Sequence, residues 1–176
     1  EFGIDTTDPK ILKVQNITVS TVVLGVDLIV TGLGLSAGTV LQSGNSVTVE
    51  WLDSNTGTLA TTASWSDRLV VRNLDTNEVL ADVQVPYNAT ARGAIAGGGS
   101  AAGEATFVLP QGPRGAGNLS FTVTADLAND VVETNIQGLA EINNTASLNL
   151  ASALAPYPDL VVTDVTPAPA LGWLPG

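Results

Sequence analysis

The segment Val47-Thr-Val-Glu-Trp51 alternates apolar and polar side chains residue by residue. Because successive side chains of a β-strand point to opposite faces, its two valines and its tryptophan share one face of the strand. An apolar face opposite a polar one is typical of a strand that covers a core on one side and meets solvent on the other. The same alternation recurs in Phe121-Thr-Val-Thr-Ala125 and at Leu148 and Leu150. The sequence therefore predicts half-buried β-strands.

Seven such segments recur along the chain, separated by residues that favour turns. We expect strands near residues 27–33, 46–52, 65–72, 78–85, 104–110, 118–126 and 144–152. The predicted fold is an all-β, immunoglobulin-like sandwich of about seven antiparallel strands, with strands from neighbouring repeats at both ends. Between the fourth and fifth strands, Ala94 to Gly103 contains three consecutive glycines, and we expect a flexible, exposed loop there.

The composition removes several classes of function. The 176 residues include 6 basic and 17 acidic ones, and the resulting net charge of -11 repels both nucleic acid and anionic lipid surfaces. The longest apolar run, at about Val22 to Val26, is far shorter than the roughly 20 residues of a membrane helix. The chain has no histidine, cysteine or methionine, so the usual nucleophile, base and zinc ligand are missing. We therefore expect no nucleic acid partner, no membrane insertion and no required cofactor.

One stretch of the sequence returns later in the chain. Asp27-Leu-Ile-Val-Thr31 is echoed as Asp159-Leu-Val-Val-Thr163, and each copy runs on to a glycine, Gly44 and Gly176. Asp27 and Asp159 lie 132 residues apart, as do the two glycines, and this equal spacing indicates a tandem repeat.

The repeat predicts three segments. Residues 1–26 would be a cloning scar followed by the end of a preceding repeat and its linker, 27–158 one complete repeat, and 159–176 the first strand of the next. The two prolines of Ala155-Pro-Tyr-Pro158 would keep the linker between repeats stiff.

Three groups of residues together resemble the bacterial CARDB-type (cell-adhesion-related) repeats. They are Val47-Thr-Val-Glu-Trp51 with Asn55-Thr-Gly57 and Thr62-Ala-Ser-Trp-Ser-Asp-Arg68; Asp126 with Val132-Glu133, Glu141 and Asn143-Asn144; and Pro158-Asp-Leu-Val-Val-Thr163. The resemblance implies an immunoglobulin-like sandwich found in tandem in large secreted or surface proteins of bacteria, often called adhesins. This chain departs from the pattern by its glycine-rich stretch and by Asn135 to Ala140, which separate two acidic residues that usually lie closer together.

The function expected from these observations is a non-catalytic structural or adhesive module, a spacer or stalk unit of an extracellular or cell-surface protein. Its partners would be neighbouring repeats of the same chain, with a glycan or surface protein also open. The alternative is a carbohydrate- or protein-binding accessory module of a secreted protein or hydrolase. A further expectation is self-association through the strand Asp159 to Val165, because an unpaired apolar strand can add to the edge of another sheet.

Two tryptophans decide between these alternatives. An exposed Trp51 or Trp65 would offer a flat apolar face to a sugar ring. For Trp51, which lies on the apolar face of its strand, burial in the core is the favoured interpretation, while Trp65 remains open. The neighbouring Asp67 and Arg68 point to opposite faces of their strand, so each should form local contacts rather than pair with the other.

The densest polar cluster follows the sixth strand. Asp126, Asp130, Glu133, Glu141 and Asn143, together with Asn129 and Asn144, supply the hard oxygen ligands that calcium prefers. The spacing is not that of an EF-hand, so a loop held by hydrogen bonds from side chains to the backbone is the favoured interpretation and calcium is the alternative. Asp130 and Glu133 lie too close in sequence to flank a sugar ring, which argues against glycoside hydrolysis and leaves the chain without a candidate for catalysis.

Overall fold

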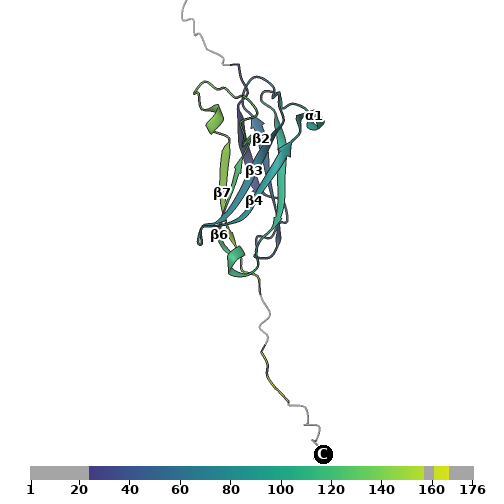
Figure 1. Ribbon diagram of the computed structural model, residues 1–176, viewed down its shortest axis with the longest axis vertical. Helices are drawn as coiled ribbons and strands as arrows, with labels where there is room; N and C mark the ends of the chain where they lie inside the picture. Colours follow the sequence, from purple (N-terminus) through teal and green to yellow (C-terminus); the bar gives the residue numbers. More distant parts are fainter. Residues whose placement is uncertain (1–23, 157–160, 167–176) are drawn as a thin grey trace, which may run out of the picture.

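Seven strands appear in the computed structural model, which describes residues 24–156 and 161–166 (Figure 1). They are β1 (Leu28–Leu35), β2 (Ser46–Asn55), β3 (Trp65–Asn73), β4 (Glu78–Tyr87), β5 (Ser100–Val108), β6 (Gly117–Thr124) and β7 (Thr145–Ser152). Each of the seven strands predicted within the module is confirmed. The largest difference is in β5, which begins four residues before its predicted start at residue 104.

The strands form two sheets that pack face to face. One sheet has the order β1-β2-β5 and the other has the order β4-β3-β6-β7, and every pairing within them is antiparallel. A bulge in β1 lies between Thr31 and Gly34. There Gly32 takes a positive φ of 61°, which a residue without Cβ adopts at little cost. The expected immunoglobulin-like sandwich is thus confirmed.

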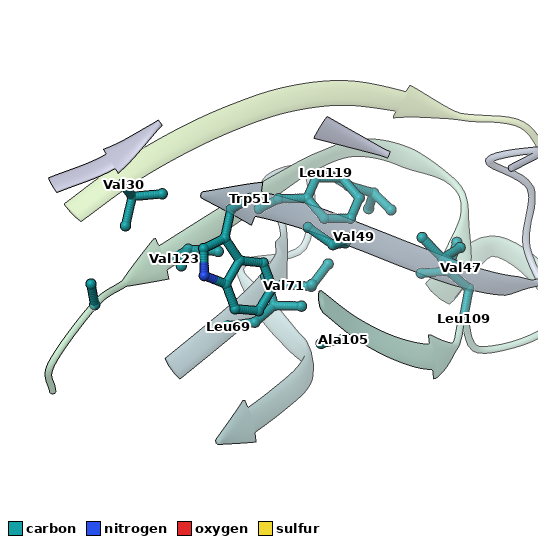
Figure 2. Close-up of a cluster of buried hydrophobic side chains, with 12 residues drawn as sticks. Val30, Val47, Val49, Trp51, Leu69, Val71, Ala105, Leu109, Leu119 and Val123 are labelled. Carbon is teal, nitrogen blue, oxygen red and sulfur yellow. The ribbon is translucent and has the colours of Figure 1, made fainter. Parts of the chain in front are cut away.

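The core lies between the sheets and is built from the alternating positions that the sequence marks. Along β3 every second residue from Trp65 to Asn73 is buried, and β2 alternates in the same way. Trp51 is 2% exposed, and Figure 2 shows its ring among valine and leucine side chains. The cluster comprises Val30, Val47, Val49, Trp51, Leu69, Val71, Ala105, Leu109, Leu119, Phe121, Val123 and Ala125.

A second apolar cluster fills one end of the sandwich. It comprises Val26, Leu28, Trp65, Tyr87, Ile95 and Val131. Trp65 is 3% exposed and stacks on Tyr87, with 4.0 Å between the ring centroids. The open question about Trp65 is therefore decided in favour of the core.

The glycine-rich stretch is an exposed loop at Ala94 and from Ala96 to Gly98, as predicted. It differs from the prediction at Ile95, which is buried in the second cluster, and from Ser100 to Gly103, which belong to β5. The backbone N–H of Asn55 donates to Gly99 O, and the backbone carbonyl of Asn55 accepts from Gly98 N. Glycine allows the close backbone approach at this loop, because a Cβ at Gly97 would overlap the main chain of Thr58.

The odd number of antiparallel strands places the two ends of the module at opposite ends of its long axis. The N-terminal end comprises residues 24–27 and the loops 56–64, 88–99 and 125–144. The C-terminal end comprises the loops 36–45, 74–77 and 109–116 and residues 153–156. In Figure 1 the purple beginning of the described chain is at the upper end, and the chain leaves β7 at the lower end.

Gly25 and Val26 contact this sandwich, although the repeat spacing predicts them in the end of a preceding repeat and its linker. The carbonyl of Gly25 accepts hydrogen bonds from Thr58 N and Leu59 N, and Val26 forms a parallel bridge with Glu133. The side chain of Val26 belongs to the second cluster.

The remaining segments are short or irregular. The described helices are α1 (Ala89–Arg92) and the 3-10 turns η1 (Gly112–Gly115) and η2 (Ala140–Ile142), none of which is long and apolar enough to cross a membrane. Residues 161–166 form no strand, and they are exposed. The predictions for residues 1–23, 157–160 and 167–176, including part of the strand Asp159 to Val165, lie outside the described residues.

Candidate functional site

Two aspartates from opposite sheets meet inside the sandwich. Asp53 of β2 is 1% exposed and Asp67 of β3 is 2% exposed. The indole N–H of Trp51 donates to both, to Asp53 Oδ1 at 3.1 Å and to Asp67 Oδ2 at 3.1 Å. Asp67 Oδ1 also accepts from Trp65 Nε1 at 2.9 Å and from Asp126 N at 3.2 Å. The two carboxyl groups therefore join the sheets at the boundary between the two apolar clusters.

The proton distribution within this pair follows from its hydrogen bonds. Burial, the neighbouring Asp67 charge and the hydrogen bond to Asp67 raise the pKa of Asp53 to about 8. Burial also raises the pKa of Asp67, while the hydrogen bonds from Asp53 and the two tryptophans lower it. Asp67 accepts three N–H groups, whereas Asp53 Oδ2 has no acceptor role. Asp53 is therefore the protonated partner at neutral pH, and Asp67 carries the negative charge.

Asn55 at the end of β2 ties the N-terminal end together. Its Oδ1 accepts from Asp27 N and Gly57 N, and its Nδ2 donates to Leu59 O and Ile95 O. The side chain is 1% exposed, so these four hydrogen bonds take the place of the hydrogen bonds that the amide would form with water. A single amide thus fixes three backbone segments: the start of β1, the turn after β2 and the glycine-rich loop.

Glu133 anchors the β6–β7 loop to β1. Its Oε2 accepts from Leu28 N at 2.6 Å, and its Oε1 accepts from Asn144 Nδ2 at 2.9 Å. Its own N–H donates to Glu141 Oε1 at 2.8 Å. Burial raises the pKa of Glu133 to about 7, although the hydrogen bonds from Leu28 and Asn144 lower it. The loop is therefore held by a largely buried carboxyl group that titrates near neutral pH.

Asp126 folds the start of the same loop back on itself. Its backbone takes a positive φ of 45°, and its carboxylate accepts from Asp130 N at 2.9 Å and Val131 N at 2.8 Å. Burial raises its pKa despite these two hydrogen bonds. This is the loop stabilised by side-chain to backbone hydrogen bonds that the sequence favours, and it is confirmed for Asp126, Glu133 and Glu141.

The five residues predicted to bind calcium lie on the same loop but do not converge fully. Glu133 and Glu141 are joined through a backbone N–H, whereas Asp126 binds Asp130 N, and Asn143 Nδ2 donates to Asp27 Oδ1 at 2.9 Å. In the described part of the chain no three acidic side chains are placed to hold one metal ion. Two buried amide oxygens of the loop, Asn143 Oδ1 and Asn144 Oδ1, have no hydrogen-bond partner in the structure.

The sequence analysis missed Asp53, Asn55 and Asp27 as structural polar residues. The signal was available, because the alternation that begins at Val47 continues inward through Asp53 and Asn55. A polar side chain at an inward strand position must be paired inside the core. The same argument applies to Asp67, which continues the inward positions of β3.

The surfaces that could take a ligand offer no stacking platform in the described residues. Trp51, Trp65 and Tyr87 are all buried, at 2%, 3% and 3% exposure. A hollow of about 520 Å³ lies against Trp51, with Arg92 among the residues that line it. Arg92 already has partners, because its guanidinium lies 4.5 Å from the centre of the Tyr87 ring and donates a hydrogen bond to a backbone carbonyl.

As expected, Arg68 forms a local ion pair, which it makes with Asp82 on the exposed face of β4.

Comparison with known proteins finds solved structures with a similar fold. No family model and no curated protein matches the sequence. A crystal structure of the CARDB domain of a Pyrococcus furiosus protein, described as a complex with di-metal ions, superimposes with a TM-score of 0.52. It is 18% identical and covers 77% of this chain and 100% of its own. A solution structure of the same domain gives a TM-score of 0.48 at 16% identity, covering 76% of this chain and 100% of its own.

A more distant likeness is to β-glucosidase 3B of Thermotoga neapolitana. It has 12% identity and a TM-score of 0.38, and the match covers 72% of this chain but 17% of the enzyme. The resemblance noted at the tryptophan, acidic and asparagine positions is thus confirmed at the level of the fold, and the chain has the immunoglobulin-like sandwich fold of CARDB domains.

Proposed function

We propose that this module is a non-catalytic spacer, a structural repeat in the stalk of a large extracellular bacterial protein of the adhesin type. The observation that carries the proposal is the position of its two ends. Seven antiparallel strands bring the chain in at one end of the long axis and out at the other, so linked modules extend in a line (Figure 1). Strands of 8 to 10 residues give each module a length of about 30 Å.

The use of the polar residues supports a structural role. The polar groups inside the protein form hydrogen bonds with main-chain and indole groups, as the side chains of Asp67, Asn55 and Glu133 do. A catalytic carboxylate instead faces a cleft in which a substrate can reach it. The extracellular location follows from the kind of protein in which tandem modules of this sort are expected, and it is part of the proposal.

Small-angle X-ray scattering on the parent polypeptide tests the spacer. The expected maximum dimension grows by about 30 Å or more for each additional module, and the parent sequence should contain further copies at a period near 132 residues. A particle whose dimension does not grow with module number contradicts the spacer. Specific binding on a glycan array favours the alternative, a carbohydrate-binding accessory module.

The second proposal is a calcium ion bound by the β6–β7 loop. The observation that favours it is that two buried amide oxygens of this loop, Asn143 Oδ1 and Asn144 Oδ1, lack hydrogen-bond partners, while the Asn144 side chain also bonds Glu133. Carbonyl and carboxylate oxygens are calcium ligands, and an ion between them would satisfy both amides. The Pyrococcus furiosus domain of the same fold, described with di-metal ions, adds support.

Thermal unfolding with and without calcium tests this proposal. A bound ion raises Tm in millimolar calcium relative to EDTA, because ligand binding to the folded state stabilises it. Asn144→Ala should abolish the difference, whereas Asn149→Ala on the outer face of β7 should preserve it. Equal Tm values in calcium and EDTA would exclude the site.

A further inference from the structure

Exposed apolar side chains gather at the two ends of the sandwich. At the N-terminal end the β6–β7 loop carries Val132, Ile136, Leu139 and Ile142, which are 83%, 64%, 48% and 75% exposed. At the C-terminal end Val40, Leu74, Val108 and Leu154 are 48% to 65% exposed. Contiguous exposed apolar surface in a folded module commonly marks a contact with another protein.

The outer faces of the sheets are different. They carry rows of hydroxyl groups that bond across the strands, in the pairs Thr48 with Thr106, Thr122 with Ser147, and Thr124 with Thr145. Ion pairs such as Arg68 with Asp82 complete this surface. The polar faces are suited to water, so the ends are the better candidates for contact between modules.

The spacing of the repeat brings these ends together. Within the described residues 24–156, the backbone group nearest the C-terminal side with a hydrogen bond to this module is Ala155 N, which donates to Ser43 Oγ at 2.9 Å. On the N-terminal side of the same range, it is Gly25, whose carbonyl accepts at the N-terminal end. The 132-residue period of the sequence places the counterpart of Gly25 at position 157. One residue, Pro156, then separates the anchored positions of consecutive modules.

This connection is too short to keep the modules apart. Consecutive Cα atoms lie 3.80 Å apart, so two peptide units span at most about 7.6 Å. Loops of consecutive modules would therefore contact each other around the junction. Their apolar side chains would leave water on contact, at roughly 25 cal/mol for each Å² of apolar surface that is buried.

We propose that the β6–β7 loop, through Val132, Ile136, Leu139 and Ile142, docks on the C-terminal end of the preceding module, where Val40, Val108 and Leu154 are exposed. The proposed partner is a second module of this kind in the same chain. This proposal rests on the proposed spacer function. It explains how the spacer would be rigid, because contact between consecutive modules restricts their relative motion, whereas modules without contact would move freely about the linker.

A chain with two modules tests the docking. Inserting a second copy of residues 24–155 after Ala155 preserves the 132-residue spacing and the rest of the chain. The measured quantity is the urea midpoint of this chain minus that of the single-module chain. Docking predicts a gain of roughly 0.5 M or more, because the interface is lost on unfolding.

Paired substitutions locate the interface. Ile136→Asp with Ile142→Asp in both chains should abolish the gain, and because both side chains are exposed the single module should keep its own midpoint. Leu52→Ser on the outer face of β2 is the matched control, since its side chain is 39% exposed away from both ends, and the gain should persist. The difference between the two chains cancels any effect of a substitution on one module alone.

The outcomes separate docking from the spacer function. No gain in urea midpoint, or a gain that survives the double aspartate substitution, overturns the docking. If scattering from the same two-module chain still shows an extended particle of twice the module length, the spacer stands without docking. A two-module chain that folds back on itself overturns the spacer.

Discussion

The raised pKa of Asp53, next to Asp67, predicts how the unfolding free energy of the protein changes with pH. The pKa of Asp53 in the folded protein is about 8, against 3.8 for an ordinary aspartate. Because the folded pKa lies above the unfolded one, the folded state binds the extra proton. The stabilising effect of that proton is complete below about pH 4 and is lost as pH rises to about 8.

The magnitude follows from the shift in pKa. One pKa unit corresponds to about 1.4 kcal/mol, so unfolding free energy should fall by up to that amount per pH unit across this window. The total for one carboxyl group is roughly 6 kcal/mol, a large part of the stability of a domain. Glu133, whose pKa is raised to about 7, contributes in the same direction over the lower part of the window.

Asp53→Asn isolates the contribution of this one carboxyl group. The amide stays neutral at every pH, and it can donate to Asp67 as the protonated carboxyl group does. We expect the unfolding free energy of Asp53→Asn to exceed that of the natural chain by several kcal/mol at pH 8.5, and the two to converge below about pH 4. Urea titrations followed by tryptophan fluorescence measure both, since Trp51 and Trp65 leave the core on unfolding.

Asp67→Asn is the matched control. An amide at position 67 keeps one acceptor oxygen but replaces the other with an NH2 group, so at least one of the three N–H donors around this carboxylate loses its acceptor. It should lower stability at every pH, by about 1–3 kcal/mol for each donor left without an acceptor. If the pH profiles of Asp53→Asn and the natural chain are parallel, the two carboxyl groups share no proton and the reasoning fails.

Three further predictions concern packing, hydrogen bonding and the surface. Gly103→Ala should lower the unfolding free energy by about 1–3 kcal/mol in urea titrations, because its Cβ would overlap the Trp51 indole, while Gly34→Ala, with no atom nearer than 3.8 Å, should change little. Asn55→Asp should lower Tm by several degrees, since a carboxylate cannot donate to the two carbonyls that Asn55 Nδ2 now binds; an unchanged Tm would contradict the role given to this amide. Arg68→Ala should leave the urea midpoint unchanged, because its ion pair is exposed to solvent.

Local alternation in the sequence was sufficient for the strands and the core. The segment from Val47 to Trp51 identified β2 and its buried face because side-chain direction in a strand depends only on the parity of the position. The same rule found all seven strands and placed Trp51 inside. The prediction for the glycine-rich loop came from its three consecutive glycines, and composition alone did not show the backbone packing against Thr58 or the hydrogen bonds to Asn55.

The tertiary structure alone decided what the polar residues do. Asp53 and Asp67 lie 14 residues apart in sequence on different sheets, and only the packing of the sheets brings them together and raises the pKa of Asp53. Glu133 reaches Leu28 N across 105 residues for the same reason. The sequence by itself determined the strands and their buried faces, which are local properties, and it predicts a repeat from the 132-residue spacing of Asp27 and Asp159. Pairing between distant polar groups depends on how the sheets close over one another, and no local pattern carries that information.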